Sequence, residues 1–348
     1  MKIGVCFGFQ NSDRQRYLDD DFSAPPAVSD ARVYEDNLYL SDLVEPLGFD
    51  SMFAIEHHGS PHHLTANPLD MLKYWAGRTS RIDLGTCLIV MPWHHPLRLA
   101  EEISMLDHML AGRKMWLGVG RGSAPREFTY MGLDIADNRE MFAESVDILR
   151  LALSEERFSY KGKHWDVKDI VMRPKPRSRD ICDRLFAGVT SDESIGIVAR
   201  MGLGIMFSSG KSPAEIDKDM SLFNGLRAEQ NLPPDPPIIL SAMYCSEDEE
   251  EAREVSAKCC AEYMEGTLWH YEFPAEIADH VKQLFVKNAL YGTPDQLIEK
   301  ISVLRDELNC EHVVLLTSIG GMTVEQSERS LRLVSEKVLP ALHGTRVG

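Results

Sequence analysis

The chain has 348 residues, of which 44% are hydrophobic and 26% are charged, and this composition is ordinary for a globular protein with a sizeable core. Its formal net charge of −17 at pH 7 argues against nucleic-acid partners, because a phosphate backbone favours basic protein faces. No apolar run approaches the roughly 20 residues that a membrane-spanning helix needs, so we expect no membrane association.

The first half of the chain alternates short apolar runs with stretches of helical period. We expect strands over residues 2–9, 50–55, 81–90 and 114–119. The helical stretches that follow them cover residues 31–47, 68–78, 96–110 and 138–153. The segment between the first strand and the first helix reads as a polar loop. Strands that alternate with helices in this way favour a parallel sheet.

The second half keeps the alternation, with two interruptions. Further strands are expected over residues 184–188, 204–207, 238–244 and 312–317. The expected helices cover residues 192–201, 213–230, 247–263, 294–308 and 324–339. Residues 157–176 look like an inserted hairpin, and residues 264–291 form a second insertion. Eight strands, each followed by a helix, predict a (β/α)8 barrel, the TIM barrel, with insertions.

We find no internal repeat, low-complexity tract or linker in the sequence, so we expect residues 1–348 to form a single domain. The N-terminus runs directly into the first predicted strand, and we expect no targeting leader. The seven cysteines are odd in number and show no paired spacing, which predicts a reduced, cytoplasmic protein.

The insertion at residues 264–291 is a candidate lid over an active site. It carries several ring side chains, namely Trp269, His270, Tyr271 and Phe273. Loops over the active sites of barrels often exclude water. An ordinary surface excursion that packs its own aromatic side chains would explain the same segment.

The loops that follow barrel strands share one face, where catalytic groups usually lie. The second predicted strand stops at Glu56, His57 and His58, and His62 and His63 follow a short turn. Paired histidines suggest a metal, but neighbouring residues of a strand point to opposite faces, so each pair offers only one ligand easily. The first strand also lacks the His-x-His pattern of metal-dependent barrel hydrolases. We therefore expect no metal, and we favour an acid–base or hydrogen-bonding role for His57.

A phosphate site is indicated at two other strand ends. Arg121 stands between glycines after the fourth predicted strand, and Ser191 and Ser194 open the helix after the fifth. Glycines let a backbone approach an oxyanion, arginine binds it in a bidentate manner, and a helix N-terminus is electropositive. A plain tight turn would also explain the Gly-x-Gly-Arg-Gly run, and serines are common helix caps.

Several motifs lie along nearly the whole chain, at residues 48–58, 84–86, 92–102, 112–113, 118–122, 291–294 and 322–340. Taken together and in this order, they resemble the bacterial luciferase-like flavin monooxygenases. Any one of these motifs would be weak evidence. Their combination is specific.

The resemblance implies a (β/α)8 barrel, commonly a homodimer, that holds reduced FMN at the carboxyl ends of its strands. It implies a monooxygenase that uses O2, through a C4a-(hydro)peroxyflavin, to oxidise an organic small molecule, with a flavin reductase supplying the reduced FMN. By position, His57 matches the family's active-site histidine and Arg121 the arginine that meets the FMN phosphate. Ser191 and Ser194 match hydroxyl residues of the phosphate site, whereas bacterial luciferase has a glutamate at the position of Thr190.

The resemblance also implies that residues around Thr86 and Cys87, on the third strand, back the isoalloxazine ring. Histidine ordinarily titrates near neutral pH, which suits His57 to the control of proton delivery. Three alternatives stay open: a deazaflavin-dependent oxidoreductase of the same fold, a flavin-binding protein without catalysis, and a metal-dependent barrel hydrolase. The sequence leaves the substrate open.

Overall fold

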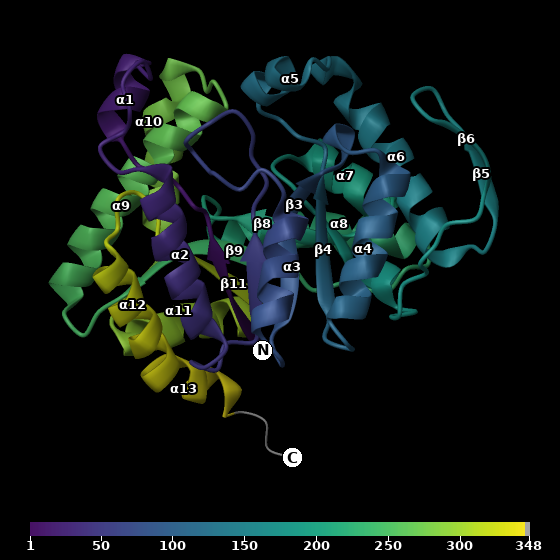
Figure 1. The fold of residues 1–348 in the computed structure, drawn as a ribbon. Helices are drawn as coiled ribbons and strands as arrows, with labels where there is room; N and C mark the ends of the chain where they lie inside the picture. The colour runs from purple at the N-terminus through teal and green to yellow at the C-terminus, as the bar shows by residue number, and fades with distance from the viewer. Residues whose placement is uncertain (345–348) are drawn as a thin grey trace.

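The computed structural model describes residues 1–344, in which parallel strands form a closed barrel surrounded by helices (Figure 1). Around the ring the strands follow the order β9, β11, β1, β2, β3, β4, β7, β8, and β8 pairs with β9 to close it. Their bounds are β1 (Lys2–Phe7), β2 (Ser51–Ala54), β3 (Asp83–Val90), β4 (Met115–Gly120), β7 (Leu185–Gly188), β8 (Gly204–Ser208), β9 (Ile238–Cys245) and β11 (His312–Thr317). The (β/α)8 barrel predicted from the sequence is confirmed.

Helices follow the barrel strands and pack around them (Figure 1). The helices expected from the sequence are α2 (Asp30–Val44), α3 (Pro68–Arg78), α4 (Pro96–Met109), α6 (Asn138–Ser154), α7 (Asp192–Arg200), α8 (Pro213–Glu229), α9 (Glu249–His270), α11 (Pro294–Leu308) and α12 (Val324–Leu333). A π-helical turn (Val334–Val338) and α13 (Leu339–His343) continue α12, and short 3₁₀ turns cover Met91–Trp93, Ile135–Asp137 and Ile181–Arg184.

Local sequence explains where several of these helices begin. Ser212 caps α8 and Thr293 caps α11, and each cap is followed by a proline at the start of the helix. Glu215 and Gln296 return a hydrogen bond to the capping residue, so both helix starts are complete capping boxes.

The interior of the barrel is filled by side chains that alternate along the strands. Phe53 on β2 is fully buried, and a Cβ atom on Gly85 of neighbouring β3 would lie 2.3 Å from its ring. On β1, a Cβ atom on Gly4 would lie 2.3 Å from the hydroxyl of Ser51, which pairs with His312 at 2.8 Å. Glycines therefore make room inside the barrel for larger neighbours on the adjacent strands.

The structure corrects the sequence prediction in five places. The elements that were not predicted are α1 (Arg14–Asp19), α5 (Pro125–Met131), α10 (Ala275–Asn288) and β10 (Leu290–Gly292), which pairs with β9. In addition, α9 runs on to His270, so most of the stretch 264–291 is helical. Two of these helices are too short to show a periodic pattern, whereas α10 does carry apolar residues at helical spacing, Ile277, Val281 and Leu284, within a stretch that was taken as a single insertion.

The segment before β7 forms an antiparallel hairpin of β5 (Phe158–Lys161) and β6 (Asp166–Ile170), which lies outside the barrel (Figure 1). Glu144 on α6 accepts hydrogen bonds from the N–H groups of Lys163, His164 and Trp165 at 2.6–3.1 Å, and so anchors the turn of this hairpin. Within residues 1–344, no helix is both long and apolar enough to cross a membrane.

Candidate active site

The loops after β2 and β3 are joined by the buried carboxylate of Glu56. Its Oε1 accepts hydrogen bonds from His94 Nε2 at 2.7 Å and His58 Nε2 at 3.0 Å, and its Oε2 accepts one from the Val90 N–H at 2.8 Å. Burial alone would raise the pKa of Glu56, but the hydrogen bonds from His58 and His94 outweigh burial and lower that pKa. The hydrogen bonds from His94 and from the Val90 N–H therefore hold the two loops together, while His58 braces Glu56 within its own loop.

His57, in the same loop, is paired with a second buried carboxylate, that of Glu127 on α5. Its Nδ1 lies 3.0 Å from Glu127 Oε1, and the His58 N–H donates to the same oxygen at 2.8 Å. Because a carboxylate only accepts, Nδ1 of His57 carries the hydrogen, and Nε2 is the ring atom left for other partners. Burial would raise the pKa of Glu127, but the neighbouring imidazoles of His270 and His57 lower it to about 2.

Three further imidazoles surround the His57 ring. The His63 ring is stacked on it at 4.9 Å between centroids, and the His270 ring meets it edge-on at 4.7 Å. The centroid of the His62 ring lies 5.4 Å from that of His57 and 4.2 Å from that of His63. Burial, and then the neighbouring histidines, lower the pKa of both His62 and His63 well below the usual value. These two rings are therefore neutral at physiological pH.

The end of α9 covers this cluster and is tied to α1 and α5. Trp269 Nε1 donates to Asp20, at the end of α1, at 2.7 Å. On the other side, the Arg126 guanidinium of α5 lies 4.1 Å from the Trp269 ring and donates to the Trp269 carbonyl at 3.1 Å. Figure 1 shows α1, α5 and α10 at the same end of the barrel, away from the N-terminus, which is where the carboxyl ends of the strands lie.

Arg121 directly follows β4, also at the carboxyl end of the strands. Its guanidinium is half-buried and makes no hydrogen bond or ion pair within the described residues 1–344. Burial lowers the pKa of Arg121, and Arg139 lowers it further, while Glu193 opposes them. Arg139 itself is hydrogen-bonded to Glu193, with one contact of 2.7 Å. Arg121 is therefore a cation with no counter-ion in contact among the residues that the structure describes.

Ser191 and Ser194 lie at the start of α7 and cap it reciprocally. Ser191 Oγ accepts from the Ser194 N–H at 3.3 Å, and Ser194 Oγ accepts from the N–H groups of Ser191 and Thr190 at 3.0 and 3.1 Å. Both hydroxyls thus have local partners, as expected for helix caps. The N–H groups of Asp192 and Glu193, the first two residues of α7, have no partner inside the helix.

Thr86 and Cys87 lie side by side on β3 and have partners within the barrel wall. The Thr86 hydroxyl donates to the Gly118 carbonyl of β4 at 2.9 Å. The Cys87 sulfur lies 3.3 Å from that of Cys6 on β1, and burial raises the pKa of the Cys6 thiol. Both thiols are buried, so these positions contribute apolar surface to the barrel interior.

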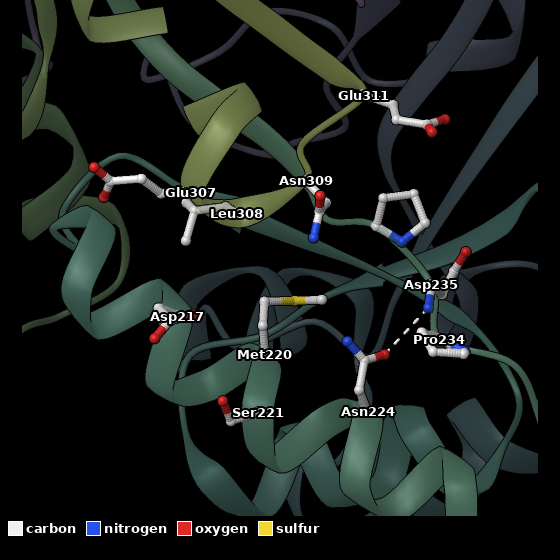
Figure 2. Close-up of a pocket in the computed structure, with 11 residues that line it drawn as sticks. Asp217, Met220, Ser221, Asn224, Pro234, Asp235, Glu307, Leu308, Asn309 and Glu311 are labelled. Carbon is white, nitrogen blue, oxygen red and sulfur yellow. Dashed lines mark hydrogen bonds between the residues drawn. The ribbon is translucent and has the colours of Figure 1, made fainter. Parts of the chain in front are cut away.

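A separate cavity of about 530 Å³ opens at the opposite end of the barrel (Figure 2). It lies between α8 and the segments that precede β9 and β11, and the Asp235 N–H donates to Asn224 at its edge at 3.1 Å. Acidic side chains surround it, including Asp217, Glu307 and Glu311. The amino ends of barrel strands usually serve stability, so we do not place chemistry there.

A comparison with family models matches residues 1–308 to the family described as luciferase-like monooxygenase. The chain belongs to this family. The resemblance found in the sequence motifs is therefore confirmed.

Two curated relatives illustrate the range of similarity. An uncharacterized protein, y4wF of Sinorhizobium fredii, is 37% identical over 163 residues, and this match spans 47% of the chain but less than half, 46%, of the relative. The alkanal monooxygenase alpha chain of Photobacterium leiognathi is 27% identical, with 98% of this chain and 99% of the relative covered.

Solved structures share this fold over almost the whole length of the chain. The monooxygenase RslO1 of Streptomyces bottropensis has a TM-score of 0.82 at 26% identity, over 98% of this chain and 100% of that one. The oxygenating constituent of 3,6-diketocamphane monooxygenase from Pseudomonas putida, solved with FMN, has a TM-score of 0.75 at 20% identity, with 98% of each chain covered. An F420-dependent secondary alcohol dehydrogenase has a TM-score of 0.74 at 18% identity, again over 98% of each chain.

Sequence reasoning missed the carboxylate that holds His57. Glu127 lies six residues after Arg121, in a segment that was given no secondary structure, although Pro125 at a helix start could have signalled α5. His270 was grouped with the aromatic insertion and not with the active site. His62 and His63 were noted, but nothing in their spacing showed that they would pack against His57.

Proposed function

We propose that the protein is an FMN-dependent monooxygenase, which uses reduced FMN and O2 to oxidise an organic small molecule at the carboxyl end of the barrel. The observation that carries the proposal is the half-buried Arg121 guanidinium, which has no hydrogen bond or ion pair within residues 1–344. It follows β4, on the same end of the barrel as the His57–Glu127 pair, which follows β2. A cation without a partner among the described residues, at the same end of the barrel as an acid–base pair, suits an anionic cofactor.

The residues around Arg121 fit the phosphate of FMN. A dianionic phosphate would give the guanidinium the partner that it lacks, in a bidentate geometry. Ser191 and Ser194 would contribute by fixing the start of α7, whose free N–H groups and positive dipole end favour an anion. The acidic Glu193 in that first turn is already paired with Arg139, which limits its repulsion of the phosphate.

Reduced FMN would supply the electrons that activate O2. His57 would hold or accept a proton at Nε2, the ring atom that Glu127 leaves free. Glu127 would be a positioning residue, because its carboxylate fixes the tautomer and orientation of the His57 ring. His62 and His63, neutral and packed against that ring, would restrict its movement without adding charge.

The covering elements would exclude water from this chemistry. We propose that α9 and α10 with their connection, together with α1 and α5, act as the lid expected at residues 264–291, because Trp269 joins the end of α9 to both α1 and α5. Thr86 and Cys87 would form the wall behind the flavin ring, since their own polar groups are satisfied within the barrel.

The affinity of the Arg121→Ala variant for FMN, compared with that of the wild type, tests the proposed phosphate site directly. One charge-assisted contact contributes about 1.5–3 kcal/mol, so we expect the Kd for FMN to rise roughly 10- to 100-fold. Fluorescence titration of FMN measures this value, with Arg98→Ala, an exposed arginine of α4, as the matched control. Equal affinity in wild type and Arg121→Ala would remove Arg121 from the phosphate site.

A second titration separates the proposal from the deazaflavin alternative. Anaerobic protein is titrated with reduced FMN and, in parallel, with reduced F420, and each complex then receives a pulse of O2. A transient absorbance that forms only with FMN and O2 supports the monooxygenase, whereas tight binding of F420 alone would favour the alternative. We also propose a separate flavin reductase as the source of reduced FMN, a homodimeric assembly and a cytoplasmic location.

A further inference from the structure

Three buried side chains near the proposed flavin site come together from different elements. His57 follows β2, Glu127 lies on α5 and His270 ends α9. Glu127 Oε1 lies 3.0 Å from His57 Nδ1 and 3.2 Å from His270 Nε2, and the three ligand atoms all lie within 4.8 Å of one another. The side chains are almost fully covered, with exposures of 8% for His57, 2% for Glu127 and 0% for His270.

The hydrogen bonding of His270 is incomplete. Neither ring nitrogen makes a hydrogen bond within residues 1–344, although Nε2 is close to Glu127, because that contact lacks the alignment of an N–H donor. Buried ring nitrogens normally have a partner, so this imidazole has unused binding capacity directed at a carboxylate. Two neutral imidazoles and one carboxylate carry a single negative charge, which attracts a divalent cation and offsets half of its charge.

We propose that His57, Glu127 and His270 bind a divalent transition-metal ion such as Zn²⁺. Zinc bonds of about 2.0–2.1 Å to nitrogen and oxygen place neighbouring ligand atoms about 3.3 Å apart in a tetrahedron. The two short contacts of Glu127 Oε1, 3.0 and 3.2 Å, are close to that spacing without any rearrangement. Three protein ligands of this type leave one position open, and imidazole with carboxylate suits Zn²⁺ better than Mg²⁺ or Ca²⁺.

The neighbouring histidines are less suited to be ligands. The His63 ring is stacked on that of His57 at an interplanar angle of 12°, so the lone pairs of the two rings run side by side and do not converge. Both nitrogens of His63 already have partners, the Gly8 carbonyl at 2.5 Å and the Tyr263 hydroxyl at 3.2 Å. His62 is likewise engaged, since Gln10 lies 3.2 Å from its Nδ1.

A metal ion at this site would stop the proposed reaction. Binding at Nδ1 moves the hydrogen of His57 to Nε2, so this ring atom could no longer accept a proton. This consequence rests on the proposed function, whereas metal binding itself does not. The site would therefore make the enzyme sensitive to inhibition by zinc.

The first experiment measures metal binding without flavin. Metal-stripped, full-length protein is titrated with Co²⁺, read by its visible absorption, and with Zn²⁺ in competition with a chromophoric chelator. We expect one ion per chain at this site, and more than about 100-fold weaker affinity in His270→Gln and Glu127→Gln, since even outer-shell partners can contribute 10–100-fold. A wild type that binds Zn²⁺ no tighter than His270→Gln would overturn the proposal.

Two control variants locate the ion. His164→Gln alters the exposed group of Asp137, Glu140 and His164, where Lys163 already lies 3.2 Å from Asp137, and we expect its affinity to equal that of wild type. His62→Gln changes a neighbour outside the proposed ligands and should also retain binding. Loss of binding in either control as large as in His270→Gln would refute the assignment.

X-ray absorption of the zinc-loaded wild type provides a test that does not depend on the folding of variants. We expect two imidazole ligands and one carboxylate, and a spectrum with no imidazole or with three would contradict the site. Turnover with reduced FMN is measured separately, with and without Zn²⁺. If zinc binds as expected and turnover continues unchanged, the metal site stands and the role of His57 in the proposed reaction fails.

Discussion

His312, on β11, gives the protein a sensitivity to acid that can be calculated. The ring is buried between Phe53 and Trp116, and its Nε2 is hydrogen-bonded to the Ser51 hydroxyl at 2.8 Å. Burial lowers the pKa of His312 from 6.5 to about 3; the positive charge of Lys2 adds to this effect and the negative charge of Asp83 opposes it. His312 is therefore neutral in the folded protein at any pH above about 3.

The sign of the effect follows from proton binding. Between pH 6.5 and pH 3 the unfolded chain takes up a proton at His312 and the folded protein does not, so acid favours unfolding. Each pH unit below 6.5 costs about 1.4 kcal/mol of stability, which amounts to about 2 kcal/mol from this one residue at pH 5. The contribution is close to zero at pH 7.

The comparison that isolates this effect is His312→Gln against wild type, because glutamine does not titrate and can keep a hydrogen bond to Ser51. Urea unfolding at pH 7 and pH 5, followed by tryptophan fluorescence and circular dichroism together, gives the loss of stability for each protein. We expect wild type to lose about 2 kcal/mol more than His312→Gln. His108→Gln, an exposed histidine of α4, is the control and should behave as wild type does. The same loss in wild type and His312→Gln would refute the reasoning.

Two further predictions concern catalysis and one concerns the fold. His57→Ala should lower turnover about 100-fold or more while FMN affinity stays near the wild-type value, as stopped-flow and fluorescence titration would show; unchanged turnover would end its proposed role. Glu127→Gln keeps the shape of the side chain but loses the charge, so turnover should fall up to about 100-fold, with the melting temperature as the check on folding. Gly320→Ala should lose about 3 kcal/mol or more of unfolding free energy, because its Cβ would lie 1.7 Å from a backbone oxygen of α9. Gly48→Ala has a similar positive φ but open space around it, so a loss above about 1–2 kcal/mol there would contradict this account.

The barrel, and the placement of His57 and Arg121 at one end of it, could be predicted from the sequence because the signals are local. Each strand is a short apolar run, and His57 and Arg121 stand directly after such runs. Topology alone then brings these residues to one end of the barrel. The family motifs add the monooxygenase family, which the spacing of apolar residues cannot show, and with it the expectation of a flavin.

The rest of the site could not be predicted because it depends on contacts between distant segments. Glu127 meets His57 across 70 residues of chain, and His270 reaches them from the end of a helix that was expected to stop at residue 263. The serines at the start of α7 show the reverse case, because the sequence allowed both a cap and a phosphate contact. The structure shows the cap, and the contact stays a prediction.

The attachment of Trp269 has a consequence for the order in which the protein forms. Its hydrogen bond to Asp20 joins residues 249 positions apart, and its contact with Arg126 joins residues 143 positions apart. Each contact joins separate elements of the barrel end, so neither can form until the barrel has brought α1, α5 and the end of α9 to the same place. The contacts among α1, α5 and the end of α9 are thus complete only once the barrel beneath them has formed. Local unfolding of the native protein would begin at these same elements.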